Sequence, residues 1–219
     1  LAKGLAVYLN SSLLDLYFRQ FSGHTQVNAT DLRALHYPDR DTLFRLGEKI
    51  SEVFPSQEEV DNMLDREIER MTKQNNNKNP LIIHRRTQEA LSILEALGLP
   101  RGQLNERSAL TLLALVDLKP ENDWGSISNP LIGITPIIEF IRDNYGKEYA
   151  PNTRETIRRQ TMHQFVNAGI AVSNPDQKNR AVNSPKWCYQ ITPDTLDLIR
   201  TFGTNIWNKK LAEYLKHRE

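Results

Sequence analysis

Basic side chains gather between Asn152 and Gln190, in a chain whose total charge is close to neutral. The whole sequence holds 28 Lys and Arg against 27 Asp and Glu, for a net charge of +1. The basic residues of this stretch are Arg154, Arg158, Arg159, Lys178, Arg180 and Lys186, and its acidic residues are Glu155 and Asp176. A local excess of positive charge of this kind is typical of a surface that meets the phosphates of a nucleic acid.

The segment from Thr153 to Ala168 has the pattern of a helix with one apolar face. The residues that share this face are Ile157, Thr161, Phe165 and Ala168. Arg154, Arg158 and Gln160 fall away from it, and Arg and Gln make paired hydrogen bonds to guanine and adenine edges. The pattern favours a helix that reads DNA, and a basic helix that only meets solvent is the alternative.

The elements around this helix predict how it is held. Two short strands follow it, Ile170 to Val172 and Trp187 to Ile191, joined by a polar loop. Further helices are predicted at Arg86 to Leu97, Glu106 to Val116, Thr135 to Tyr145, Asp194 to Phe202 and Ile206 to Lys216. We therefore predict a mainly α chain whose C-terminal part is a winged helix-turn-helix domain with a small β-hairpin.

The N-terminal part is predicted to be a helical segment of a different kind. We expect one helix from Ala2 to Phe21, an extended segment from Leu32 to Tyr37, and helices at Asp41 to Val53 and Gln57 to Met71. The acidic residues from Glu58 to Glu69 are expected on a solvated face. The predicted domains are residues 1–40, a helical connector 41–73, a linker 74–85 and a DNA-binding domain 86–219. Because the chain opens with Leu1 inside a helical pattern, we expect it to be a fragment.

The composition narrows the kinds of structural site and cellular location that we expect. The single cysteine, Cys188, can form no internal disulfide, and it lacks Cys or His neighbours at the spacing of a zinc site, so no metal site is expected. No apolar run reaches the roughly 18 to 20 residues of a membrane span, and no secretion leader is evident. We expect a cytoplasmic protein without a membrane partner.

The run from Tyr8 to Pro38, and within it FRQFSGHTQVNATDL, resembles the end of the target-recognition region of bacterial adenine-specific DNA methyltransferases of restriction-modification systems. The resemblance implies that certain residues face DNA or pack against the methylase core. They are Arg19, Gln20, His24, Thr25, Gln26, Asn28 and Asp31. An internally hydrogen-bonded turn in this loop is the alternative, and the residues do not decide between the two.

A second resemblance covers well over half of the chain. The strings ALGLPRGQLNERSALTLLALVDLKP, NPLIGITPIIEFIRDNYGKEYAPNTRETIRRQTMHQFVNAGI and NSPKWCYQI resemble the N-terminal helix-turn-helix domain of BsuBI/PstI-type restriction endonucleases. The DNA contacts that this implies are Asn152, Thr153, Arg154, Glu155, Arg158, Arg159 and Gln160. Lys178, Arg180 and Lys186 are added as contacts from the predicted wing.

Catalytic motifs are missing from the sequence. Adenine methyltransferases carry an Asn-Pro-Pro-Tyr motif, and the nearest strings, Asn79-Pro80-Leu81 and Asn129-Pro130-Leu131, lack the second proline and the aromatic residue. No glycine-rich loop follows a strand to hold S-adenosylmethionine. No Glu-x-Lys or Asp-x-Lys pairing, which a magnesium-dependent nuclease would carry on a strand, is evident. We expect no catalytic residue and no cofactor in this chain, with S-adenosylmethionine implied for the parent enzyme.

The function favoured by the sequence is recognition of specific double-stranded DNA. The chain would be the C-terminal, non-catalytic part of an adenine-specific methyltransferase of a type II system, inactive alone, with the upstream catalytic domain as its partner. One alternative is an interaction module, built from Asp41 to Met71 and Ile206 to Lys216, that pairs the methylase with an endonuclease or with a second copy as a homodimer. Another is a winged-helix transcription regulator.

Overall fold

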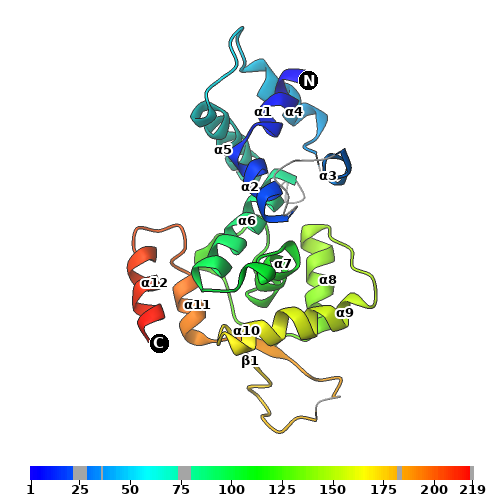
Figure 1. Cartoon of the computed structure of the whole chain (residues 1–219), viewed down its shortest axis with the longest axis vertical. Helices are drawn as coiled ribbons and strands as arrows, with labels where there is room; N and C mark the ends of the chain where they lie inside the picture. Colours follow the sequence, from blue (N-terminus) through cyan, green and yellow to red (C-terminus); the bar gives the residue numbers. More distant parts are fainter. Residues whose placement is uncertain (22–28, 36, 74–79, 182–183, 218–219) are drawn as a thin grey trace. The chain divides into compact units, whose positions relative to one another are not determined.

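The computed structural model describes residues 1–21, 29–35, 37–73, 80–181 and 184–217. The chain divides into two compact units, Leu1–Gln88 (unit 1) and Glu89–Glu219 (unit 2). Among the described residues the structure is mainly helical with a small two-stranded antiparallel sheet, which confirms that part of the predicted fold class (Figure 1). None of the described helices combines the length and the apolar character that crossing a membrane requires.

The described secondary structure of unit 1 consists of helices joined by short segments. Its helices are α1 (Ala2–Leu9), α2 (Ser12–Phe21), α3 (Ala29–Ala34), α4 (Arg40–Glu48) and α5 (Gln57–Lys73). Helix α6 (Pro80–Ala96) crosses the division between the units. The apolar core of unit 1 draws on α1, α2, α4, α5 and the start of α6, with Tyr8, Leu46 and Leu64 among its largest buried side chains.

Helices α1 and α4 approach closely because glycines lie where they cross. A Cβ atom on Gly4 would lie 1.7 Å from the carbonyl oxygen of Leu43, and one on Gly47 would lie 2.9 Å from the amide nitrogen of Gly4. Only residues without a side chain permit this approach.

The side chain of Glu67 in α5 is buried, although the acidic residues from Glu58 to Glu69 are expected on a solvated face. An ion pair accompanies this burial, with Arg45 Nη2 2.6 Å from Glu67 Oε1.

The prediction of a single helix from Ala2 to Phe21 is wrong, because the helix is interrupted at Ser11. The buried hydroxyl of Ser11 donates to the Tyr8 carbonyl at 2.8 Å and accepts from the Leu14 amide at 3.3 Å. It thus satisfies the end of α1 and the start of α2 together, as a capping serine does.

Three further boundaries differ from the prediction. The segment expected as extended, Leu32 to Tyr37, begins inside α3, which ends at Ala34, and both Leu32 and Leu35 pack with the apolar core. Helix α4 ends at Glu48, before Val53, whose side chain is 77% exposed and would gain no burial from a longer helix. Residues 80–85, expected in the linker, form the start of α6, where a first-turn proline is favourable.

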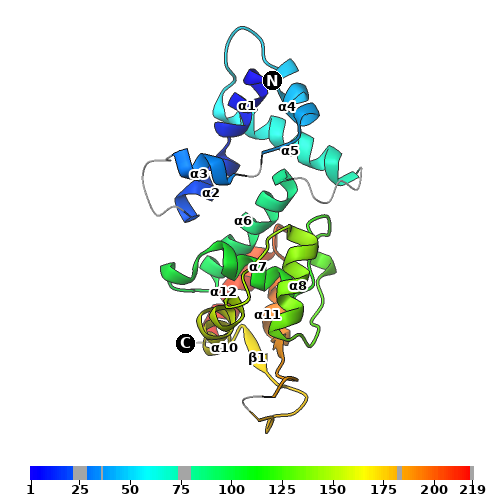
Figure 2. The same cartoon turned by 90° about the vertical axis from the view of Figure 1, so that its right-hand side faces the viewer.

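Unit 2 is built around α7. Its elements are η1 (Arg101–Gln103), α7 (Glu106–Leu115), η2 (Trp124–Ser126), α8 (Ile134–Tyr145), α9 (Thr153–Thr156), η3 (Ile157–Met162), α10 (His163–Asn167), β1 (Ala171–Ser173), β2 (Tyr189–Ile191), α11 (Pro193–Ile199) and α12 (Trp207–Lys216). Every residue of α7 from Ser108 onward is buried. Both views show α7 inside this unit with α8 and α10 near it (Figures 1 and 2).

The sheet pairs β1 with β2 in antiparallel register, with Val172 opposite Gln190. Ile132, just before α8, adds an isolated bridge to Tyr189 through two hydrogen bonds of 3.0 and 2.9 Å. Gly169 connects α10 to β1 with a positive φ of 63°, a left-handed conformation that glycine adopts at little cost. The hairpin is therefore joined both to the start of α8 and to the end of α10.

The glycine crossing predicts a selective loss of stability. Gly4→Ala should lower the free energy of unfolding of unit 1 by about 1 to 3 kcal/mol or more, because the new methyl group meets the backbone of α4. Thermal unfolding followed by circular dichroism measures the loss. Gly102→Ala is the matched control, since nothing lies within 4 Å of its added Cβ atom. Equal effects of the two substitutions would contradict the close crossing.

Candidate nucleic-acid interface

The helix predicted from Thr153 to Ala168 exists, but it is not a uniform α-helix. Segments α9, η3 and α10 follow one another directly, and η3 (Ile157–Met162) has π-helical geometry. A π turn bonds residue i to residue i+5 and occurs mostly as a single turn inside an α-helix. One more residue therefore fits into the turn that packs against the core.

The buried face of this helix includes the predicted residues and one more. Ile157, Thr161 and Phe165 are completely buried, and so is Met162. Regular α-helical spacing would turn Met162 away from Ile157, and the π turn brings both inward. Ala168, the last residue expected on this face, is half-buried.

The outward face carries three arginines in two different states. Arg154 is exposed and makes no hydrogen bond or ion pair with the residues that the structure describes. Glu155 holds the other two: Arg158 Nη2 lies 3.1 Å from its Oε1 atom, and Arg159 Nε donates to the same oxygen. These bonds from Arg158 and Arg159 hold the pKa of the Glu155 carboxyl below its ordinary value.

Gln160 is exposed, and an arginine of α7 holds its amide. Arg107 Nη2 donates to Gln160 Oε1 at 3.2 Å, and Arg107 Nε donates to Thr161 Oγ1 at 3.2 Å. The sequence analysis missed Arg107, because no local pattern relates it to residues more than 50 positions away.

The described residues of the loop between the strands, 174–181 and 184–188 (the hairpin loop), extend away from the helices of unit 2 in both views (Figures 1 and 2). Lys178 and Lys186 lie in this loop with exposed side chains, as a phosphate-binding role requires. Neither lysine forms an ion pair within the described part of the chain.

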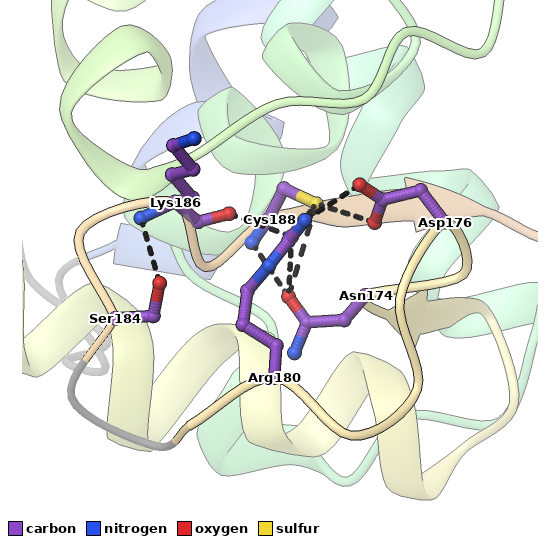
Figure 3. Close-up of polar contacts among 6 residues, drawn as sticks. All are labelled: Asn174, Asp176, Arg180, Ser184, Lys186 and Cys188. Atoms are coloured by element: carbon purple, nitrogen blue, oxygen red, sulfur yellow. Dashed lines mark hydrogen bonds and ion pairs between the residues drawn. The ribbon is translucent and has the colours of Figure 1, made fainter.

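Arg180, the third basic residue of the hairpin loop, faces the interior of the loop (Figure 3). Its side chain is only 9% exposed, and its Nη2 atom lies 2.6 Å from Asp176 Oδ2. Cys188 is buried as expected, and this burial raises the pKa of its thiol. Among the described residues, no three His, Cys, Asp or Glu side chains are placed to hold a metal ion.

Residues of the α9–α10 helix and of the hairpin loop line a common cavity of about 550 Å³. Arg154, Glu155 and Arg158 of the helix line it, together with residues of the hairpin loop and the start of α8. The remaining lining residues are Gly133, Ile134, Thr135, Pro136, Pro151, Asn152, Ser184, Pro185 and Trp187. The predicted contacts Arg159, Gln160, Lys178 and Lys186 do not line it. Trp187 and Ser184 were missed by the sequence analysis, since only the return of the hairpin brings them to the helix.

The candidates of unit 1 are not placed as a site. His24, Thr25, Gln26 and Asn28 lie outside the described residues. Arg19 and Gln20 fall in α2 and Asp31 in α3, with side chains outside the described set. Whether this region faces DNA stays a prediction.

Comparison with known proteins gives a family match that covers unit 2. The BsuBI/PstI restriction endonuclease HTH domain family matches residues 84–219. Over 137 residues the chain is 57% identical to the type II restriction enzyme BsuBI of Bacillus subtilis, which covers 63% of this chain and 43% of that enzyme. The solved structure of the SdaI restriction endonuclease aligns with a TM-score of 0.55 at 35% identity, over 58% of this chain and 40% of that one.

A shorter similarity connects the chain to methyltransferases. It is 49% identical over 71 residues to the type II methyltransferase M.PstI of Providencia stuartii, covering 32% of this chain and 14% of that enzyme. The chain thus spans less than half the length of the restriction enzymes and a small part of the methyltransferase.

The ion pairs of Glu155 predict a measurable titration. Replacing both Arg158 and Arg159 by alanine should raise the pKa of Glu155 toward the ordinary value of about 4.3. Because pairing lowers the pKa in the folded chain, the pairs stabilise it above the unfolded-state pKa and lose this effect as pH falls through the folded-state pKa.

Carbon-detected NMR titration of the carboxyl group measures this pKa. Arg154→Ala is the control, because Arg154 makes no ion pair with Glu155 and its loss should leave the pKa low. A pKa that did not rise in the double variant would contradict the pairing.

Proposed function

Because the chain belongs to the BsuBI/PstI restriction endonuclease HTH domain family, we propose that unit 2 recognises double-stranded DNA within a restriction-modification protein. The observation that carries the proposal is the helix from α9 to α10, which buries Ile157 and Phe165 and exposes Arg154 and Gln160. An α-helix fits the major groove of B-DNA, where all four base pairs are distinguishable. An apolar inner face with Arg and Gln outside suits this position.

The hairpin serves as a wing in this proposal. The order of α8, the α9–α10 helix and the β1–β2 hairpin agrees with a winged helix-turn-helix, and the bridge between Ile132 and Tyr189 attaches the hairpin to the start of α8. The wing would follow the DNA backbone beside the groove that the helix enters.

The basic residues divide into two tasks. In this proposal Arg154, Arg158 and Gln160 meet base edges, with Asn152, Thr153 and Arg159 at the margins. Lys178 and Lys186 meet phosphates, which gives affinity without sequence preference. Glu155 keeps two arginines occupied in the free chain, so DNA must replace its carboxylate before Arg158 can bind a base.

The rest of the parent protein is proposed from the partial methyltransferase similarity. We place this chain beside an adenine-specific methyltransferase catalytic domain that binds S-adenosylmethionine, with unit 1 as the end of that enzyme's target-recognition region. The family match gives no support to the alternatives, a transcription regulator or a module that pairs proteins.

Salt dependence tests the proposed DNA binding. Four to six neutralised phosphates should give a slope of about −4 to −5 for log K against log salt on a short duplex. Fluorescence anisotropy between about 50 and 200 mM salt measures this slope. A slope near zero would show that the basic face only meets solvent.

Two substitutions separate base reading from phosphate binding. A duplex is first selected from a randomised library with the unchanged chain. Arg158→Ala should then cost about 1 to 3 kcal/mol on the selected duplex and relax the preference at one base pair. Lys178→Ala should weaken the selected and a scrambled duplex alike and reduce the salt slope by about one.

Lys209→Ala on α12 is the matched control for the lysine, because it removes an exposed lysine that is not part of the interface. It should leave binding unchanged. If Arg158→Ala weakened both duplexes equally, the helix would not be the element that reads the sequence.

A further inference from the structure

The hairpin loop is long for the sheet that carries it. Its described residues are joined to the unit by strands that pair at only three positions, which alone stabilise little structure. Ordering such a loop costs conformational entropy for each of its residues. Interactions inside the loop must therefore hold its shape.

Arg180 supplies these interactions from one side chain (Figure 3). Its Nη1 atom lies 3.1 Å from Asn174 Oδ1, 2.7 Å from the Lys186 carbonyl and 3.1 Å from Cys188 Sγ. Its Nη2 atom donates to Asp176 Oδ2 at 2.6 Å. We call this set of contacts the arginine clasp: the outgoing arm of the loop provides Asn174 and Asp176, and the returning arm provides Lys186 and Cys188.

Asn174 extends the clasp to the sheet. Its backbone has a φ of 47°, in the left-handed region that asparagine tolerates better than most residues. The Oδ1 atom of Asn174 also accepts from the backbone amide of Cys188 at 3.1 Å. The backbone amide of Asn174 donates to the Cys188 carbonyl at 2.9 Å. The base of the loop is thereby closed from both arms.

The clasp and the turn next to it contact the backbone on both sides of the loop, where the two lysines lie. The Arg180 amide bonds to the Gln177 carbonyl at 3.2 Å and closes the turn that contains Lys178. The bond from Arg180 to the Lys186 carbonyl holds the backbone of the second lysine. Asp176 neutralises Arg180, whose side chain is nearly enclosed, so little of its own charge is offered to a partner.

We infer that Arg180 is a positioning residue for DNA binding: it folds the hairpin loop so that Lys178 and Lys186 face the phosphates, and it makes no phosphate contact itself. This inference rests on the proposed function of unit 2. It reassigns a residue that the sequence predicts as a direct contact.

Charge and geometry give opposite expectations for two substitutions, which makes the inference testable. Asp176→Asn adds one positive charge to the interface, so simple electrostatics predicts tighter DNA binding. Arg180→Lys keeps the charge but lacks the planar fork that reaches several acceptors together. The inference predicts that both weaken binding to the selected duplex, each by about tenfold, and that Arg180→Lys also reduces the salt slope, because displaced lysines neutralise fewer phosphates.

Asp197 and Arg200 of unit 2 form a matched exposed pair, 3.2 Å apart, outside the interface. Asp197→Asn and Arg200→Lys repeat the same chemical changes there and should leave duplex binding unchanged. Amide hydrogen exchange supplies a second readout without DNA: the amides of Asn174 and Cys188 should exchange faster in both clasp variants. The buried amides of α7 should not change, which shows that the unit stays folded.

Arg180→Lys binding as tightly as the unchanged chain, together with tighter binding by Asp176→Asn, would overturn the inference and return Arg180 to the phosphate contacts. Unchanged exchange at Asn174 and Cys188 would overturn it as well. If the unchanged chain itself bound no duplex, the proposed function would fail and the positioning role with it. That outcome differs from a chain that binds DNA equally well with and without the clasp.

Discussion

The burial of α7 is the constraint on which the rest of unit 2 depends. Its residues from Ser108 to Leu115 are all buried, and α8, η3 and β2 pack against this helix. Ile157, Thr161 and Met162 complete this packing, and the π turn allows two adjacent residues to point inward. Arg107, at the start of α7, adds hydrogen bonds to Gln160 and Thr161. The basic side chains of this helix thus point outward because its apolar side chains are packed against α7.

Internal pairing restrains the positive charge of the same surface. Glu155 occupies Arg158 and Arg159, and Asp176 occupies Arg180, which leaves Arg154, Lys178 and Lys186 without ion pairs in the described part of the chain. We propose that the unpaired cations attract any duplex. Arg158, in contrast, leaves the Glu155 carboxylate for a base only when that base offers well-placed hydrogen-bond acceptors. Such an arrangement limits non-specific binding, because replacing an existing ion pair requires an equally good partner.

The sequence predicts most of the elements of unit 2 and fewer details of unit 1. Periodicity placed α7, α8 and the Thr153 to Ala168 helix well, because long apolar faces give a strong signal. It could not reveal the π turn, since Met162 is brought inward by tertiary packing. The break at Ser11 and the helical start of Leu32 to Tyr37 depend on hydrogen bonds and core contacts that short apolar runs do not show. The contacts of Arg107 and Arg180 join residues across a domain or a loop, where spacing carries no information.

We propose that one surface, formed by residues 152–160 and the hairpin loop, contacts DNA. NMR amide shifts, recorded while the selected duplex is added to the whole chain, locate the residues that respond to DNA. We expect the changes to concentrate at Asn152 to Gln160 and at the amides around Lys178 and Lys186. Changes confined to α4 and α5, or none at saturating duplex, would contradict it.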